Sequence, residues 1–360
     1  MKALNIIIIC LSLSLVHSAI AASVNVKKLV AQEWIVIEND RFSIISNATE
    51  KQASAMLQEL ENFHYLVSNV FGFGEIELAE KIPIVLVNNE SVFRALGMPR
   101  DYVGIFLSSK RGGAIFARAD KFRSADKGQN WGRLVVLHEL AHLLMSHSHR
   151  KLISSPWFNE GIAEYLGSYT LNNNQIILGN LSTLRSGFFS PAARSGRRYD
   201  SVDTESLFKV TQEDLKVGLR SSREHNMFVD KFYARSAAVV HYFDANEQRR
   251  NLMYQYLALI QKGAEVDNAF EQVFDMDFDD LDRKVNAYVR GRAMTPRVFS
   301  LDRSDLEFAP ADNTLVDITP LQIMQKLYGK ISLFSDEFLG KGTRAKMNEE
   351  FETVFPEFFQ

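Results

Sequence analysis

The sequence predicts an α+β fold, because its β-rich and its helical segments occupy different parts of the chain instead of alternating. Short runs rich in β-branched and aromatic residues are concentrated before residue 118, where one amphipathic helical pattern interrupts them. Long helical patterns begin at residue 131 and continue to about residue 292. The chain has 360 residues, 46% of them hydrophobic, which is enough for one large domain or for one domain with an appendage.

The first third of the chain is expected to form a mixed β-sheet with one helix packed on it. Five segments are predicted to be strands, at residues 34–37, 42–46, 82–87, 102–107 and 114–117. The first two flank Asn39-Asp40, which favours a hairpin. Thr49 is expected to cap a helix that runs to about Val70. Its apolar residues recur at helical spacing: Ala53, Met56, Leu57, Leu60, Phe63, Leu66 and Val67.

The middle of the chain is predicted to be mainly helical. Two helices are expected over residues 131–146 and 156–168. A loop-rich stretch then extends to about residue 224 and includes a basic cluster at residues 194–198. From there, residues 227–292 have a helical pattern throughout.

Residues 295–360 are expected to form a short helical C-terminal extension. Thr319-Pro320 starts an amphipathic helix whose apolar face comprises Leu321, Met324, Leu327, Ile331 and Phe334. The chain then ends in a segment rich in phenylalanine, with Phe351, Phe355, Phe358 and Phe359. We expect this segment to dock on the main domain, and binding to a partner is the alternative.

The first 21 residues are expected to be a cleaved signal peptide. Lys2 precedes an apolar stretch from Ile6 to Val16, and Ala19-Ile20-Ala21 provides a cleavage site of small residues. Cleavage there would remove Cys10, the only cysteine, so the mature protein would contain no disulfide. We therefore expect a secreted or periplasmic protein without stable membrane insertion after cleavage.

The charge balance argues against partners that select for a basic surface. The chain has 41 Lys and Arg against 44 Asp and Glu, a formal charge of −3. Such a balance does not predict binding to nucleic acid or to an anionic membrane surface. We also find no internal repeat and no loop with the pattern of a phosphate-binding motif.

A motif with metal-binding spacing lies in the helix predicted over residues 131–146. Residues 138–142 are HELAH, so His138 and His142 are one turn apart on the same helix face. Two imidazoles placed in this way can bind one small cation at roughly 2.0–2.1 Å. Glu139 points about 100° around the helix from His138. It would lie beside the metal, where it can accept a proton from a bound water.

Glu160 is the candidate for a third ligand. It follows His142 by eighteen positions and lies in the next predicted helix, from which a carboxylate could complete the protein ligands and leave a fourth position for water. An isolated HExxH also arises by chance on ordinary helices. The apolar residues around this motif favour a metal, because burial of two imidazoles and a carboxylate without partners is costly. His147 and His149 occupy a polar segment and are expected at the surface.

The two motifs together resemble the gluzincins, the group of zinc metallopeptidases that contains thermolysin and aminopeptidase N. The resemblance is greatest to secreted, zincin-like proteins of the peptidase MA-like type. It rests on HELAH followed by WFNEGIAEY at residues 157–165 and ends near Thr295. It implies a zincin-like domain over residues 30–292, with an N-terminal mixed sheet, an active-site helix and a helical C-terminal lobe.

The resemblance also assigns roles to individual residues. It implies one Zn²⁺ ion held by His138, His142 and Glu160, with Glu139 as the catalytic base. Glu164 corresponds to the acidic residue that hydrogen-bonds a ligand histidine, the kind of partner that fixes the ring orientation of a metal-bound histidine. A solvated helix carboxylate is the alternative for Glu164.

A downstream block, residues 232–243, resembles the helix that carries an oxyanion-stabilising tyrosine in aminopeptidase-type gluzincins. Tyr233 is the matching residue, and a phenol directed at developing negative charge suits that role. A tyrosine with an apolar environment is also an ordinary core residue. His225 and His241 are lesser candidates for the same role, and the apolar neighbours of His241 favour a core position.

One segment departs from the aminopeptidase pattern. Those enzymes bind the substrate amino group with a glutamate on an edge strand, but residues 112–117 contain glycines and β-forming residues and no acid. We expect this edge to pair with an extended peptide by strand addition. An endopeptidase is therefore favoured over an aminopeptidase.

The sequence thus predicts a zinc-dependent hydrolase that cleaves peptide bonds, with a peptide or protein as its substrate. The alternative is a zinc-binding envelope or interaction protein with little or no turnover. The presence of Glu139 argues against this alternative, because only a catalyst requires the base.

Overall fold

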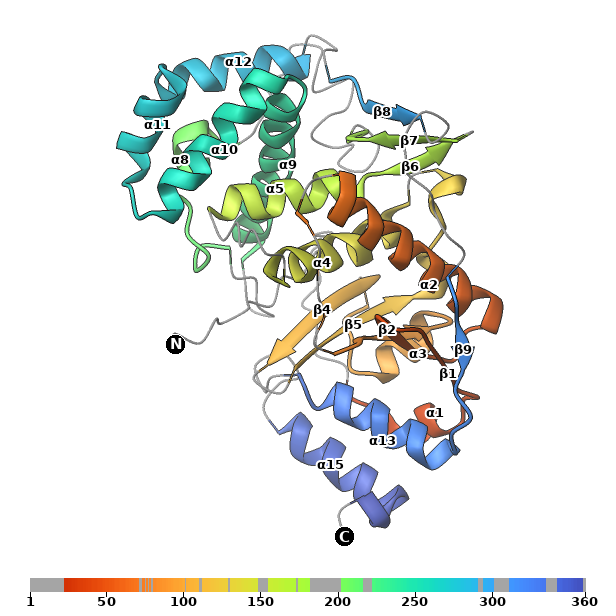
Figure 1. The fold of residues 1–360 in the computed structure, drawn as a ribbon. Helices are drawn as coiled ribbons and strands as arrows, with labels where there is room; N and C mark the ends of the chain where they lie inside the picture. The colour runs from red at the N-terminus through yellow and green to blue at the C-terminus, as the bar shows by residue number, and fades with distance from the viewer. Residues whose placement is uncertain are drawn as a thin grey trace.

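A six-stranded mixed sheet lies at the centre of one part of the protein (Figure 1). Both ends of the described chain belong to this part. The computed structural model describes residues 23–358 except for 71–72, 75, 77, 79, 101, 110–111, 129, 148–154, 173, 182–201, 216–221, 291–293, 301–310 and 335–341. The expected signal peptide, His149 and the basic cluster at 194–198 lie outside the described residues. Mixed sheet and helices together make the fold α+β, as predicted.

The order of strands in the large sheet is β4-β5-β3-β2-β1-β9. Their bounds are β1 (Ile35–Glu38), β2 (Phe42–Ser46), β3 (Ile82–Val87), β4 (Gly104–Ser109), β5 (Gly112–Arg118) and β9 (Thr314–Leu315). β1 and β2 form the expected antiparallel hairpin, whereas β2, β3 and β5 run parallel to one another. β4 is antiparallel to β5 and closes one end of the sheet.

Helix α2 (Glu50–Tyr65) makes the crossover between the parallel strands β2 and β3. It begins at a capping box in which Thr49 and Gln52 each bond the other's backbone N–H. A π-helical turn, η1 (Leu66–Val70), continues it. All seven apolar residues predicted for one face of this helix are buried.

The sheet separates two hydrophobic layers. Successive residues of a strand point to opposite faces, so Ile44 and Ile84 belong to one core cluster and Ile45 and Val85 to the other. The first cluster extends into α2 and the helices of the C-terminal lobe. The second is covered by four helices, α1 (Val26–Val30), α3 (Glu90–Ala95), α13 (Pro320–Ile331) and α15 (Thr343–Val354).

The helical lobe packs on the sheet through α4, which lies between the sheet and the other helices of the lobe (Figure 1). Its helices are α4 (Trp131–His147), α5 (Pro156–Gly167), α8 (Thr204–Lys209), α9 (Arg223–Asp244), α10 (Glu247–Gln261), α11 (Val266–Phe274) and α12 (Phe278–Arg290). Short 3₁₀ turns are η2 (Ala119–Lys121), η3 (Ala125–Lys127) and η5 (Pro356–Phe358). An aromatic cluster holds the lobe together, with Trp157, Phe208, Tyr256, Phe270 and Phe274 in mutual contact.

The stretch after α5 is more ordered than the sequence predicts. It contains a hairpin of β6 (Thr170–Asn172) and β7 (Gln175–Leu178), as well as α8. Asn174 has a φ of 59° in the turn of this hairpin, a conformation that asparagine tolerates better than most residues. These elements are too short to produce a clear periodicity, so only a loop-rich stretch could be predicted there.

The C-terminal segment is also not purely helical, which corrects the expected helical extension. β8 (Arg297–Ser300) joins β7 in a three-stranded sheet, and β9 pairs with β1 at the end of the large sheet. Phe351 is fully buried in the second core cluster. Both strands are defined by pairing with distant partners, which local sequence does not reveal. Among the described helices, none has the length and apolar character needed to cross a membrane.

The predicted edge strand is wrong. The segment at 112–117 belongs to β5, which pairs with β3 on one side and β4 on the other. β4 is the terminal strand instead. A hairpin pattern specifies that two strands pair, but it does not specify which of them also joins the rest of the sheet.

Candidate metal centre

Helix α4 carries HELAH through an apolar environment. Asn130 Oδ1 accepts a hydrogen bond from the backbone N–H of Arg133 at 3.0 Å, which satisfies a donor in the first turn. Every residue from Gly132 to Ala141 is buried, so the imidazole of His138 is held inside the protein. His142, one turn later, retains 15% exposure of its side chain. The helix therefore presents one buried and one partly accessible imidazole on a single face.

Helix α5 brings the third side chain to this face. Pro156 occupies its first turn, where the missing N–H has no helical partner to lose. Glu160 follows one turn later and is fully buried. A Cβ added to Gly167 would lie 3.4 Å from the backbone nitrogen of His138, so the two helices approach closely at this glycine.

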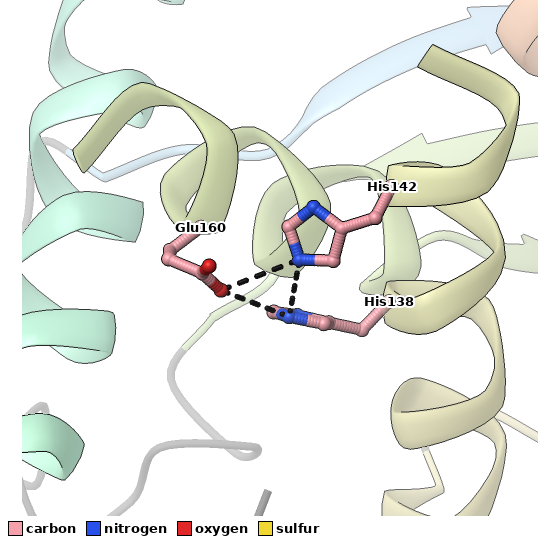
Figure 2. A group of neighbouring side chains, drawn as sticks. All are labelled: His138, His142 and Glu160. Atoms are coloured by element: carbon pink, nitrogen blue, oxygen red, sulfur yellow. Dashed lines mark hydrogen bonds and ion pairs between the residues drawn. The ribbon is translucent and has the colours of Figure 1, made fainter. Parts of the chain in front are cut away.

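The three side chains converge on one point (Figure 2). His138 Nε2 lies 3.1 Å from Glu160 Oε2 and 3.0 Å from His142 Nε2. His142 Nε2 lies 3.3 Å from the same oxygen of Glu160. Ligands bound tetrahedrally to one zinc at 2.0–2.1 Å are separated by about 3.3 Å. The triangle of donor atoms therefore has the size that a tetrahedral ion requires.

The chemistry of the three donors also fits a cation. Two imidazole nitrogens 3.0 Å apart repel each other when both are unprotonated, and a shared cation removes that repulsion. Glu160 Oε1 and Glu139 Oε1 are buried and have no hydrogen-bond partner among the described residues. Unpaired buried carboxylate oxygens are costly. This His–His–Glu group could thus hold a metal ion, and it is the one group of three such residues within the described part of the chain.

Glu164 lies behind His138, on the side away from the other donors. Its Oε1 is 3.4 Å from His138 Nδ1, a long ion-pair distance that does not meet hydrogen-bond geometry. Both side chains are buried, so no bulk water competes for this contact. The second ring nitrogen of His138 thus has a carboxylate as its neighbour.

The electrostatics of the side chains follow from burial and from their mutual charges. Burial alone lowers the pKa of His138, but the carboxylates of Glu160 and Glu164 outweigh it and raise the pKa to about 10. Burial opposes the charge of Glu160, yet His142 and His138 lower its pKa to about 2. The pKa of Glu139 is raised to about 8 by burial, against the effect of His138. The site thus favours an anionic Glu160 and contains one strongly basic imidazole.

Tyr233 lies beside the group, on the adjacent helix α9. Its ring centroid is 5.9 Å from that of His138, and the two ring planes are inclined by 48°. Only 2% of the residue is exposed. The fold therefore brings the tyrosine of the 232–243 block next to a candidate ligand.

The remaining candidate histidines do not join the cluster. His147 is exposed at the end of α4, where its Nδ1 lies 2.9 Å from the carbonyl oxygen of Leu143. His225 is in the first turn of α9, where its backbone N–H donates to Ser222 Oγ. His241 is buried, and its Nδ1 bonds the hydroxyl of Tyr288 at 2.8 Å. His241 is therefore a core histidine, as its apolar neighbours predict.

A buried ion pair at the start of α4 escaped the sequence analysis. Arg133 Nη1 bonds Glu59 Oε1 at 3.0 Å, and Arg133 Nη2 bonds the carbonyl oxygen of Tyr169 at 2.5 Å. The other oxygen of Glu59 accepts from the backbone N–H of Ala125 at 2.9 Å. The contacts of Arg133 join the start of α4 to α2 and to the backbone of Tyr169. The contact of Glu59 with Ala125 joins α2 to the segment that precedes α4. A charged residue in each of two otherwise apolar helix faces was the signal that could have revealed the pair.

Comparison with known protein families gives no matching family model for this chain, and no curated protein matches its sequence. The structure therefore shows an α+β protein with a buried His–His–Glu group that could hold a metal ion.

Proposed function

We propose that this protein is a zinc-dependent peptidase with a zincin-like, gluzincin-type site. The observation that carries the proposal is the triangle of His138 Nε2, His142 Nε2 and Glu160 Oε2 with separations of 3.0–3.3 Å. Two nitrogens and one oxygen suit zinc, whose catalytic sites use three protein ligands and an open position. The resemblance of HELAH and WFNEGIAEY to gluzincins supports the same proposal.

When bound at these residues, zinc would lower the pKa of a water molecule to about 7 and polarise a carbonyl group. Glu139 follows the first ligand directly on α4, and its Oε1 has no hydrogen-bond partner among the described residues. Its carboxylate would accept the proton of the attacking water and deliver it to the leaving nitrogen. Burial, which raises the pKa of Glu139, makes this carboxylate a stronger base than an exposed glutamate.

Two further side chains would support this chemistry. Glu164 would hold His138 through Nδ1 and so direct Nε2 toward the other donors. Tyr233 would donate a hydrogen bond from its hydroxyl to the oxyanion that forms on the attacked carbonyl, a role suited to its place beside His138. Glu164 would thus orient a ligand, and Tyr233 would lie where negative charge develops on the attacked carbonyl.

We propose an extended peptide as the substrate. β4 packs against α4, and Gly104 of β4 lies close to Val135, one turn before His138. No other described strand pairs with the outer side of β4. A terminal strand offers backbone groups that can pair with an extended chain. β4 thus replaces the segment at 112–117 as the strand for substrate pairing.

The proposal is tested by metal analysis combined with digestion of a peptide library. The mature protein should contain one zinc per chain and release new amino termini from the library, and Glu139→Gln should abolish the cleavage but not the zinc. Zinc without cleavage by wild type would support the zinc-binding protein with little turnover. Neither zinc nor cleavage would reject both functions. A secreted or periplasmic location is part of the proposal and follows from the expected signal peptide.

A further inference from the structure

Helices α5 and α9 touch at a glycine next to a candidate metal ligand. A Cβ placed on Gly161 would lie 2.5 Å from the carbonyl oxygen of Ser236 and 2.7 Å from its carbonyl carbon. The same Cβ would lie 2.7 Å from Val240 Cγ2. Real Cβ atoms essentially never come within 3.0 Å of such neighbours. Only glycine therefore permits the observed distance between the two helices.

The contact joins the two parts of the proposed active site. Gly161 directly follows Glu160 on α5, and Ser236 is three residues after Tyr233 on α9. Residues three apart lie on the same side of a helix. The backbone contact is thus within about one turn of both the carboxylate and the phenol.

We propose that Gly161 is a positioning residue, which sets the distance between Tyr233 and the metal centre by allowing close contact between α5 and α9. This inference rests on the proposed function and adds a residue to it. An alanine would have to displace Ser236 by at least about half an ångström, because its obstacle is backbone and cannot rotate away.

The displacement should fall on α9 rather than on the metal ligands. Glu160 would share the ion with His138 and His142, so a bound metal would hold α4 and α5 together. α9 contributes none of the three donor atoms, so a bound ion would not hold it to α4 and α5. Gly161→Ala should therefore retain the metal but move Tyr233 away from it. A misplacement near 1 Å in an active site can reduce the rate by about 10²-fold.

The direct test measures the distance between the metal and Tyr233 without any substrate. The protein is loaded with Co²⁺, and its tyrosine rings are labelled with ¹³C, so that the paramagnetic ion broadens the NMR signals of nearby rings. Tyr233→Phe identifies the Tyr233 signal. In Gly161→Ala the protein should bind one Co²⁺ as wild type does, and the broadening of the Tyr233 signal should fall clearly. An unchanged broadening, or loss of the ion, would overturn the inference.

Peptide hydrolysis supplies the second readout. Gly161→Ala should lower kcat by up to about 10²-fold with little change in KM. In the Tyr233→Phe background the same substitution should cost almost nothing more, because the hydroxyl that it displaces is already gone. If Gly161→Ala lowers kcat in the Tyr233→Phe background by the same factor as in wild type, Gly161 acts on something other than Tyr233.

Two further variants keep the test decisive. Gly329→Ala on α13 is the matched control, because a Cβ there meets nothing within 4 Å and should change neither readout. If Gly161→Ala does not fold, Val240→Ile adds one carbon at the same contact and should move Tyr233 in the same direction. Wild type that binds Co²⁺ but cleaves no peptide would contradict the proposed function, while the NMR measurement would still decide the role of Gly161.

Discussion

His138 is held between two carboxylates of the same helix, with Glu160 Oε2 3.1 Å from its Nε2 and Glu164 Oε1 3.4 Å from its Nδ1. The two glutamates are four residues apart on α5, so they lie on the same side of that helix. One ring nitrogen thus faces the other two residues of the candidate metal group, and the other faces a carboxylate outside it. Glu160 therefore has the position of a candidate ligand, and Glu164 has the position of a residue that orients His138.

Glu164→Gln should weaken metal binding without abolishing it. The amide retains the size of the carboxylate but loses the negative charge next to His138 Nδ1. Loss of such a partner typically reduces metal affinity by about 10–100-fold. Competition with a chromogenic chelator measures the change. An affinity equal to that of wild type would mean that Glu164 is only a buried carboxylate of the helix.

Loss of one of the three donor side chains should weaken zinc binding more than the change at Glu164. His138→Ala, His142→Ala and Glu160→Ala each delete one of the three donor atoms, so each should largely remove zinc from the purified protein. His147→Ala is the matched control, since His147 is on the same helix but exposed and outside the group. Elemental analysis gives the result, and full zinc in all three ligand variants would contradict the assignment.

Zinc affinity should rise with pH. The neighbouring carboxylates raise the pKa of His138 to about 10, so at pH 7 the metal-free site holds a proton that zinc must displace. Release of one proton makes the apparent affinity rise on the order of tenfold per pH unit below that pKa. Calorimetry in two buffers of different ionisation enthalpy counts the protons released. A titration with no net proton release would contradict the protonated state of His138.

The two histidines of the His–His–Glu group could be paired from sequence because their relationship is local. His138 and His142 are one turn apart on the same helix, α4. Glu160 was predicted from its place in the next helix, α5. The strand positions in the first third were likewise predicted from periodicity. The place of β4 at the end of the sheet was not, because it depends on which hairpin strand pairs with β3. The closeness of Gly161 and Ser236 is a property of two packed helices and has no local pattern.

The buried pair of Glu59 and Arg133 yields a prediction about stability. Their side chains are 3% and 1% exposed, so each charge depends on the other. Arg133→Met should destabilise the protein by about 3–5 kcal/mol, because it leaves Glu59 charged and buried without its partner. Chemical denaturation measures this loss. Arg41→Met, which removes a more exposed ion pair with Glu61, is the control and should cost about 1 kcal/mol or less.

Glu139→Gln should separate metal binding from catalysis. Glu139 is on α4 between the two histidines but is not one of the three converging donors, so zinc and fold should be retained. Glutamine has nearly the same shape but cannot accept the proton of the attacking water, and loss of a general base commonly costs about 10²–10⁴-fold in rate. The measurement is kcat/KM on a library-derived peptide, with zinc content determined on the same sample. If the variant with full zinc cleaves as fast as wild type, Glu139 is not the base, and cleavage that persists equally in His142→Ala would identify a contaminating protease.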